Sequence, residues 1–345
     1  MSDRRQYFDV SIGTILKIAA VVIALALLYL TREILVILFL AVIIASAVSL
    51  FAGTLERYRV PRLIGVLSIY LAGIGFFGLV LYFIIPPIVD EIKQMAVILP
   101  DYYETAARQI FKTTSGISPD YAKNAQNILL NLGEKIKELT SGIFNIVSAL
   151  FGSAVSFMAI IVISFYLSIQ KKGVEDFLRL ITPQGQEEYV IDVWIRVEKK
   201  LGKWLQGQII LALIMGAMVF VGLTLIGVPY ALLLGVIAGL LEIVPIAGPI
   251  LSALVGVSMA IIISPFLALL TLIFYIIAQQ VENHILVPIL MKKATGLNPV
   301  VVIVALLVGA KLGGVLGMLV AVPLATIAGE LLEDFSKKKT LLKNI

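Results

Sequence analysis

The sequence predicts an all-α polytopic membrane protein, with about six full transmembrane helices, two re-entrant helical hairpins in an inverted repeat, and amphipathic helical loops. Hydrophobic residues fill 60% of the 345 positions and charged residues only 14%, whereas soluble domains contain about 45–50% and about 25%. Several apolar runs reach the eighteen residues that indicate a bilayer-spanning helix. Two further apolar stretches are broken midway by Gly or Pro beside a charged residue, which favours hairpins over full spans.

Residue types that are scarce in the chain exclude several classes of protein. Because there are no cysteines, disulfides and cysteine-ligated metals are impossible. His284 is the sole histidine, so we expect no histidine-based metal site, and no cofactor. The net charge of +5 is interpreted as the bias that orients membrane proteins. We therefore expect no nucleic-acid partner.

The first 86 residues contain three predicted spans, at 12–30, 34–51 and 63–85. The loop between the second and third spans carries Arg57, Arg59 and Arg62, and basic loops of membrane proteins lie on the cytoplasmic side. That placement also puts the N-terminus, with Arg4 and Arg5, in the cytoplasm. The expected location is the plasma or inner membrane, with both termini cytoplasmic.

Two amphipathic segments flank the fourth predicted span, at 143–169. Segment 87–142 is predicted to be extracytoplasmic, and we interpret it as a packing or oligomer-contact layer, with a ligand-binding domain as the alternative. Segment 170–207 has Trp194 and Trp204 near three lysines. Tryptophan beside basic residues is typical of a helix at the cytoplasmic membrane interface.

Residues 208–328 are predicted to form a transport core built from two inverted copies of one unit, followed by a basic cytoplasmic tail at 329–345. Each copy is a span (208–226 and 266–285) followed by a broken apolar stretch (230–263 and 300–328). The pieces of each stretch are roughly 11–15 residues long, too short for a bilayer that needs about 20. Inverted repeats with broken helices are common in secondary transporters, whose site lies at the repeat interface.

The tips of the two broken stretches and the helix between them supply the candidate site. Glu242 is a carboxylate in an apolar run, and such a group is expensive and usually functional. Lys311, at the second tip, is its expected counter-charge, either in a structural ion pair or in competition with a substrate. Gln279, Glu282 and Asn283 share one helix face, which could also be an ordinary polar helix end. The predicted substrate- or ion-binding residues are Glu242, Pro245, Gly248, Pro249, Gln279, Glu282, Asn283, Gly309, Lys311 and Gly313.

Enzyme signatures are missing from the sequence. It contains neither the G-x-x-x-x-G-K-[ST] phosphate loop nor H-E-x-x-H, and its one histidine suits no triad within the membrane. We predict a protein that is not an enzyme and has no ATPase of its own, so that transport would be driven by gradients or be passive.

Essentially the whole chain resembles the autoinducer-2 exporter family of bacterial and archaeal membrane proteins, and the specific motifs lie in its C-terminal half. The motifs that carry the resemblance are EIVPIAGP at 242–249, QQVENHILVP at 279–288, Asn298-Pro299, GGVLG at 313–317 and AVP at 321–323. The resemblance implies export of small polar signalling molecules in some members, sodium/proton antiport in others, and homo-oligomers, with the pentamer as the expected form. The family usually carries His before the Pro that opens the last hairpin; here Asn298 stands there, and no titrating role is transferred to it.

The sequence therefore predicts a secondary transporter or exporter of a small polar solute such as an autoinducer-2-like molecule. A sodium or other monovalent cation/proton antiporter is the first alternative, and a non-transporting membrane scaffold is the second. The expected partners are the lipid bilayer and a small polar solute, or a monovalent cation and protons. The residues leave open the identity of the solute, its direction and the coupling ion.

Overall fold

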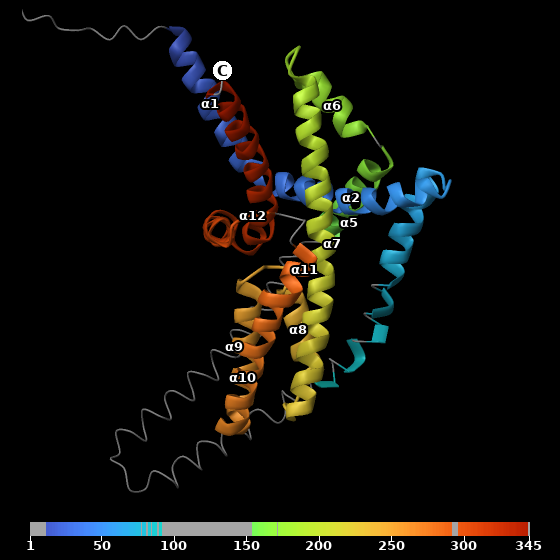
Figure 1. The fold of residues 1–345 in the computed structure, drawn as a ribbon, viewed down its shortest axis with the longest axis vertical. Coiled ribbons are helices and arrows are strands. Elements are labelled where there is room, and N and C mark those ends of the chain that lie inside the picture. The colour runs from blue at the N-terminus through green and yellow to red at the C-terminus, as the bar shows by residue number, and fades with distance from the viewer. Residues whose placement is uncertain are drawn as a thin grey trace, which may run out of the picture.

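The fold is taken from a computed structural model, which describes residues 12–76, 78–80, 82–83, 85–87, 90–91, 154–170, 172–291 and 296–343. Every regular element in these ranges is a helix (Figure 1), which confirms the all-α prediction. The predicted segment 87–142 lies almost wholly outside the described residues. So does the first part of the predicted fourth span, up to residue 153.

The chain before residue 186 forms α1, α2, an unlabelled helix, α5 and α6. Their bounds are Ile12–Leu30, Arg32–Arg57, Arg62–Pro87, Ala154–Ile169 and Gly173–Ile181. A break of a few residues turns α6 away from α5 by 87°. The polar face of α6 carries Glu175, Asp176 and Arg179, as expected of a helix at an interface.

The remaining elements run from α7 to α12. They are α7 (Glu187–Ile226), α8 (Ala231–Leu241), α9 (Ala247–Ile263), α10 (Pro265–Val281), the π-helical turn η1 (Glu282–Leu286), α11 (Val287–Met291) and α12 (Pro299–Lys343). The start of α10 follows from its sequence, because the Ser264 side chain accepts a hydrogen bond from the Phe266 amide and Pro265 fits the first turn.

Six helices within the described ranges are long and apolar enough to cross a membrane. Five of them contain or closely match predicted spans: α1, α2, Arg62–Pro87, α7, and α10 continued through α11. The sixth is α12, where a second hairpin was predicted. Many large apolar side chains on these helices are exposed, as lipid-facing side chains are expected to be.

Helix α7 is the central element, and α2, α6, α8, α10, α11 and α12 all pack against it. In Figure 1, α2 lies across the long axis of α7. The crossing is close because Gly202 faces the backbone of Ser46: an added Cβ would lie 2.6 Å from that carbonyl oxygen. The Gln206 side chain then donates to the Ala47 carbonyl oxygen at 3.0 Å.

Helix α7 also shows a difference from the predicted boundaries. We expected a separate interfacial segment to end at residue 207, but α7 continues unbroken for 40 residues. At 1.5 Å per residue this is about 60 Å, twice the thickness of a bilayer core. The change from charged to apolar composition therefore marks a change of surroundings along one continuous helix. The glycines of α7 allow close packing with neighbouring helices and do not end the helix.

Helix α12 is two arms joined at a sharp bend. Gly314 has φ 59° and ψ −136°, a conformation that residues with a side chain rarely adopt. A Cβ on Gly309 would lie 2.4 Å from the Gly317 carbonyl oxygen, whereas eight residues of straight helix span about 12 Å. The chain therefore doubles back around Gly313 and Gly314. That this bend is re-entrant in a membrane stays a prediction.

Gly202→Ala tests the crossing of α2 and α7. The added methyl group meets fixed backbone, so we expect a loss of about 1–3 kcal/mol, the range for overpacking, measured as a lower Tm in detergent. Gly53→Ala is the control, because no atom in the described ranges lies within 4 Å of its Cβ position. Equal Tm values for the two variants would contradict this packing.

Candidate functional site

The apolar stretch between α8 and α9 is broken, as its sequence predicts. Pro245 has no amide proton, and Ile246 has φ 67°, so the helix cannot continue through them. Gly248 lets the two pieces meet: a Cβ there would lie 2.0 Å from the Leu241 carbonyl oxygen. Gly248 and Pro249 are both buried. These residues place Glu242 at the end of α8, inside the protein.

A second irregularity lies opposite the first. Between α10 and α11 the chain makes the π-helical turn η1, which begins at Glu282. Turns of this kind are rare and are often found at functional sites. The Gln279 amide nitrogen donates to Glu282 Oε2 at 2.8 Å and lies 3.4 Å from Asn283 Oδ1. The predicted cluster of Gln279, Glu282 and Asn283 is thus brought together.

The two irregular segments bring Glu242 and Glu282 side by side, within hydrogen-bonding reach of each other. Glu242 is 2% exposed and Glu282 is 4% exposed. Two buried carboxylates would repel each other strongly, and a hydrogen bond between carboxyl groups requires a proton on one of them. A proton held between the two carboxyl groups would relieve this repulsion.

One oxygen of this pair has no partner. Glu242 Oε1 is fully buried and makes no hydrogen bond. Within the described ranges, no other buried side-chain oxygen or nitrogen lacks a partner. A buried acceptor without a donor is costly and points to an occupant such as a proton, an ion or a solute. The site can therefore bind a proton, an ion or a group that donates a hydrogen bond.

Gln208 is a further residue of the site, and it is not among the residues predicted from the sequence. It is 2% exposed and donates from its side-chain amide to the Glu242 backbone carbonyl oxygen. This bond joins α7 to the break between α8 and α9. The available signal was a glutamine at the edge of an apolar run, the same kind of signal that identified Glu242.

The expected pairing of Glu242 with Lys311 is not what the structure shows. The ionisable neighbour of Glu242 is Glu282, and Lys311 is exposed, as is Gly313. Both arms of α12 pack through apolar residues such as Leu306 and Ala321. The bend carries Lys311 and Gly313 at the surface, and a binding role for Gly309, Lys311 and Gly313 stays a prediction.

The fold and the buried carboxyl pair define the chain as a multi-pass α-helical membrane protein with an ionisable site in its interior. The chain belongs to the AI-2E transporter family, because the model described as AI-2E family transporter matches residues 18–337. This confirms the resemblance drawn from the motifs of the C-terminal half.

Individual relatives agree with that assignment. "Putative transport protein YueF" of Bacillus subtilis (strain 168) is 29% identical over 283 residues, covering 78% of this chain and 75% of that protein. "Putative transport protein YrrI" of the same organism is 26% identical over 288 residues, covering 81% and 80%. "Putative permease PerM" of Escherichia coli (strain K12) is 22% identical over 246 residues, covering 70% and 66%. Transport is thus the activity in the names of these relatives.

Gln208→Leu tests the bond that joins α7 to the break. The variant keeps the side-chain volume but removes the donor to the Glu242 carbonyl, so we expect a loss of about 1–3 kcal/mol, measured by thermal unfolding in detergent. Gln280→Leu is the matched control, since the Gln280 side chain is exposed. A Gln208→Leu protein as stable as the control would show that this bond does not hold the break in place.

Proposed function

We propose that this protein is a proton-coupled secondary transporter of a small polar solute, and that Glu242 and Glu282 hold the coupling proton. The observation that carries the proposal is the buried carboxyl pair with one unpartnered oxygen. Ionisable residues within membrane segments face a cavity or one another, and they form the proton relays of pumps and transporters. The membership of a transporter family supports this choice.

The coupling follows from the difference between the two protonation states. With a shared proton the pair carries one negative charge; without it, two charges repel each other in an apolar interior. Release of the proton therefore requires water, or a solute with polar groups, to reach the carboxyl groups. A conformation that hydrates the pair loses the proton, and a conformation that closes over it regains one, which couples proton movement to the opening of the site.

The solute is a small polar molecule such as autoinducer-2, recognised through hydroxyl and carbonyl groups. The side-chain amides of Gln279 and Asn283 lie next to the carboxyl pair and offer both donors and acceptors. No part of this recognition requires ATP.

Monovalent cation/proton antiport is a second candidate function, favoured by a separate observation. The carboxyl groups of Glu242 and Glu282 lie together, and the Asn283 side-chain oxygen is joined to Glu282 through the Gln279 amide. Oxygen ligands suit hard cations such as sodium. In this version a cation replaces the shared proton, because both neutralise the same pair.

The architecture that we propose for the transporter follows the predictions made from the sequence. We propose that α8 and α9 form one re-entrant hairpin, that the arms of α12 form the other, and that the two belong to inverted copies. We further propose a homo-oligomer in the plasma or inner membrane, with both termini cytoplasmic. The exposed apolar faces of α1 and α10 support contacts with lipid or with neighbouring copies.

Vesicle transport with Glu242→Gln tests the proposed function. The glutamine keeps the shape and the hydrogen-bonding capacity of the carboxyl group but cannot hold or release the proton. We expect uptake or efflux of labelled autoinducer-2 driven by an imposed pH gradient to fall to the level of empty vesicles. Glu188→Gln, which neutralises an exposed acid on α7, should transport like the unmutated protein.

The same vesicles separate the two candidates. If a sodium gradient moves protons while autoinducer-2 stays in place, the protein is an antiporter, and Glu242→Gln should abolish that proton movement. A Glu242→Gln protein whose flux still follows the pH gradient would overturn the proposed role of the carboxyl pair in either version.

A further inference from the structure

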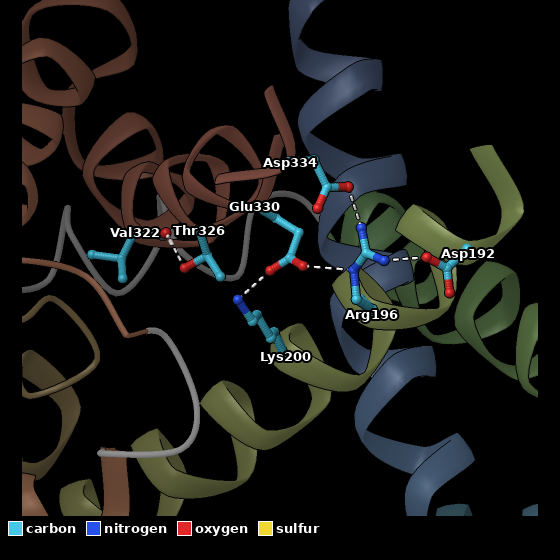
Figure 2. A network of polar contacts seen from close by, with 7 residues as sticks. All are labelled: Asp192, Arg196, Lys200, Val322, Thr326, Glu330 and Asp334. Atoms are coloured by element: carbon cyan, nitrogen blue, oxygen red, sulfur yellow. Dashed lines mark hydrogen bonds and ion pairs between the residues drawn. The ribbon is translucent and has the colours of Figure 1, made fainter. Parts of the chain in front are cut away.

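A network of charged side chains joins the N-terminal part of α7 to the C-terminal part of α12 (Figure 2). Arg196 Nε lies 2.7 Å from Glu330 Oε1, and its two other guanidinium nitrogens contact Asp192 and Asp334. Lys200 Nζ contacts the other oxygen of Glu330. The Glu330 carboxylate is thus held by two cations from α7 while it is only 6% exposed.

The network is one end of a longer contact between the two helices. On α12, Val322, Thr326, Glu330 and Asp334 follow one another at intervals of four residues and so form one face. Val322, Thr326 and Glu330 are buried, and the Thr326 hydroxyl donates to its own helix at Val322, which leaves no polar group unmatched there. Figure 2 shows the ionic end of this face directed at α7.

The matching face of α7 leads to the carboxyl pair. Arg196, Lys200, Trp204 and Gln208 also follow one another at intervals of four residues. Gln208 holds the backbone of Glu242, and it lies about 12 Å along the helix from Lys200. The ionic network and the candidate site are therefore attached to one helix, about two turns apart.

Helix α12 also covers the break that carries Glu242. One apolar core contains Val244 from the break, Trp204 from α7, and Leu306, Ala321 and Val322 from the two arms of α12. Val244 is only two residues from Glu242. If α12 moves away from α7, this core opens and water gains a route to the break.

A hinge for that movement is present. The two arms of α12 meet at Gly314, whose backbone conformation is available chiefly to glycine. No atom of the described residues lies within 4 Å of a Cβ placed on Gly313 or Gly314, so this part of the chain leaves space around the bend. The ionic network lies on the second arm, sixteen residues beyond Gly314 at Glu330.

We propose that Arg196, Lys200, Glu330 and Asp334 form a latch that closes α12 over the break between α8 and α9, and that release of this latch opens the route to Glu242. The inference rests on the proposed function of Glu242 as the ion site. Ion pairs suit this role because removing one partner leaves the others as uncompensated charges, so the closed state depends on the complete set. Apolar packing alone supplies no such switch.

Thiol labelling measures the opening directly, because the unmutated chain has no cysteine. Val244→Cys or Ala321→Cys places a reporter in the core that α12 covers. Ala260→Cys places one in a separate core, between α9 and its neighbours. All three sites are buried, and the full-length protein in lipid vesicles is reacted with a membrane-permeant maleimide. Glu330→Gln is then added to each reporter.

We expect Glu330→Gln to speed labelling at positions 244 and 321 about tenfold, the change in an opening equilibrium that corresponds to one charge-assisted hydrogen bond, and to leave position 260 unchanged. Lys200→Arg retains the ion pair and Glu188→Gln removes an acid outside the network, so both should label like the parent. Equal labelling of the Glu330→Gln and Glu188→Gln proteins would overturn the latch. Faster labelling at all three positions would also overturn it, because the network would then stabilise the whole fold.

The labelling experiment tests the latch and the transport experiment tests the proposed function, and their outcomes are independent. Labelling needs no solute and no flux, whereas Glu242→Gln leaves every member of the latch in place. If Glu330→Gln leaves labelling unchanged while Glu242→Gln abolishes proton coupling, the latch is wrong and the proposed function stands. If the reverse is found, α12 opens as described but Glu242 is not the coupling site.

Discussion

Two carboxyl groups lie side by side in the interior of a protein made mostly of apolar helices, and the surrounding structure depends on accommodating them. The free-energy cost of ionising both carboxyl groups rises as water is excluded from around them. Glu242 and Glu282 reach each other because each lies where a helix is irregular. Glu242 lies at the break between α8 and α9, and Glu282 lies at the π-helical turn after α10.

Helix α7 holds these defects in place and relates them to the rest of the molecule. Its apolar half packs closely on α8, since Gly216 faces the backbone of Gly235 and Gly239. Gln208 fixes the break, and the charged half of the helix reaches the last turns of α12. In the proposed latch, a displacement of α12 would reach the site through α7 and through the apolar core that the two helices share with Val244.

Much of the fold and part of the site could be predicted from the sequence. Apolar length identified the spans, and the Pro and Gly residues of 245–249 located the break, because their backbone restrictions are local. The cluster of Gln279, Glu282 and Asn283 was predicted from helical spacing. The partner of Glu242 was not: opposite charge favoured Lys311, but contact depends on how α12 bends at Gly314 and packs on α7. Long-range packing of this kind leaves no local signal, and the same holds for Gln208.

The shared proton is the central claim, and infrared spectroscopy of the purified protein in lipid at neutral pH tests it most directly. A protonated carboxyl group has a carbonyl stretch well separated from that of carboxylates, and deuterium exchange shifts it. The account predicts one such band from the pair, lost in the Glu242→Gln protein and equally lost in the Glu282→Gln protein, because either substitution ends the sharing. A spectrum without this band, or a band that survives both substitutions, would contradict it.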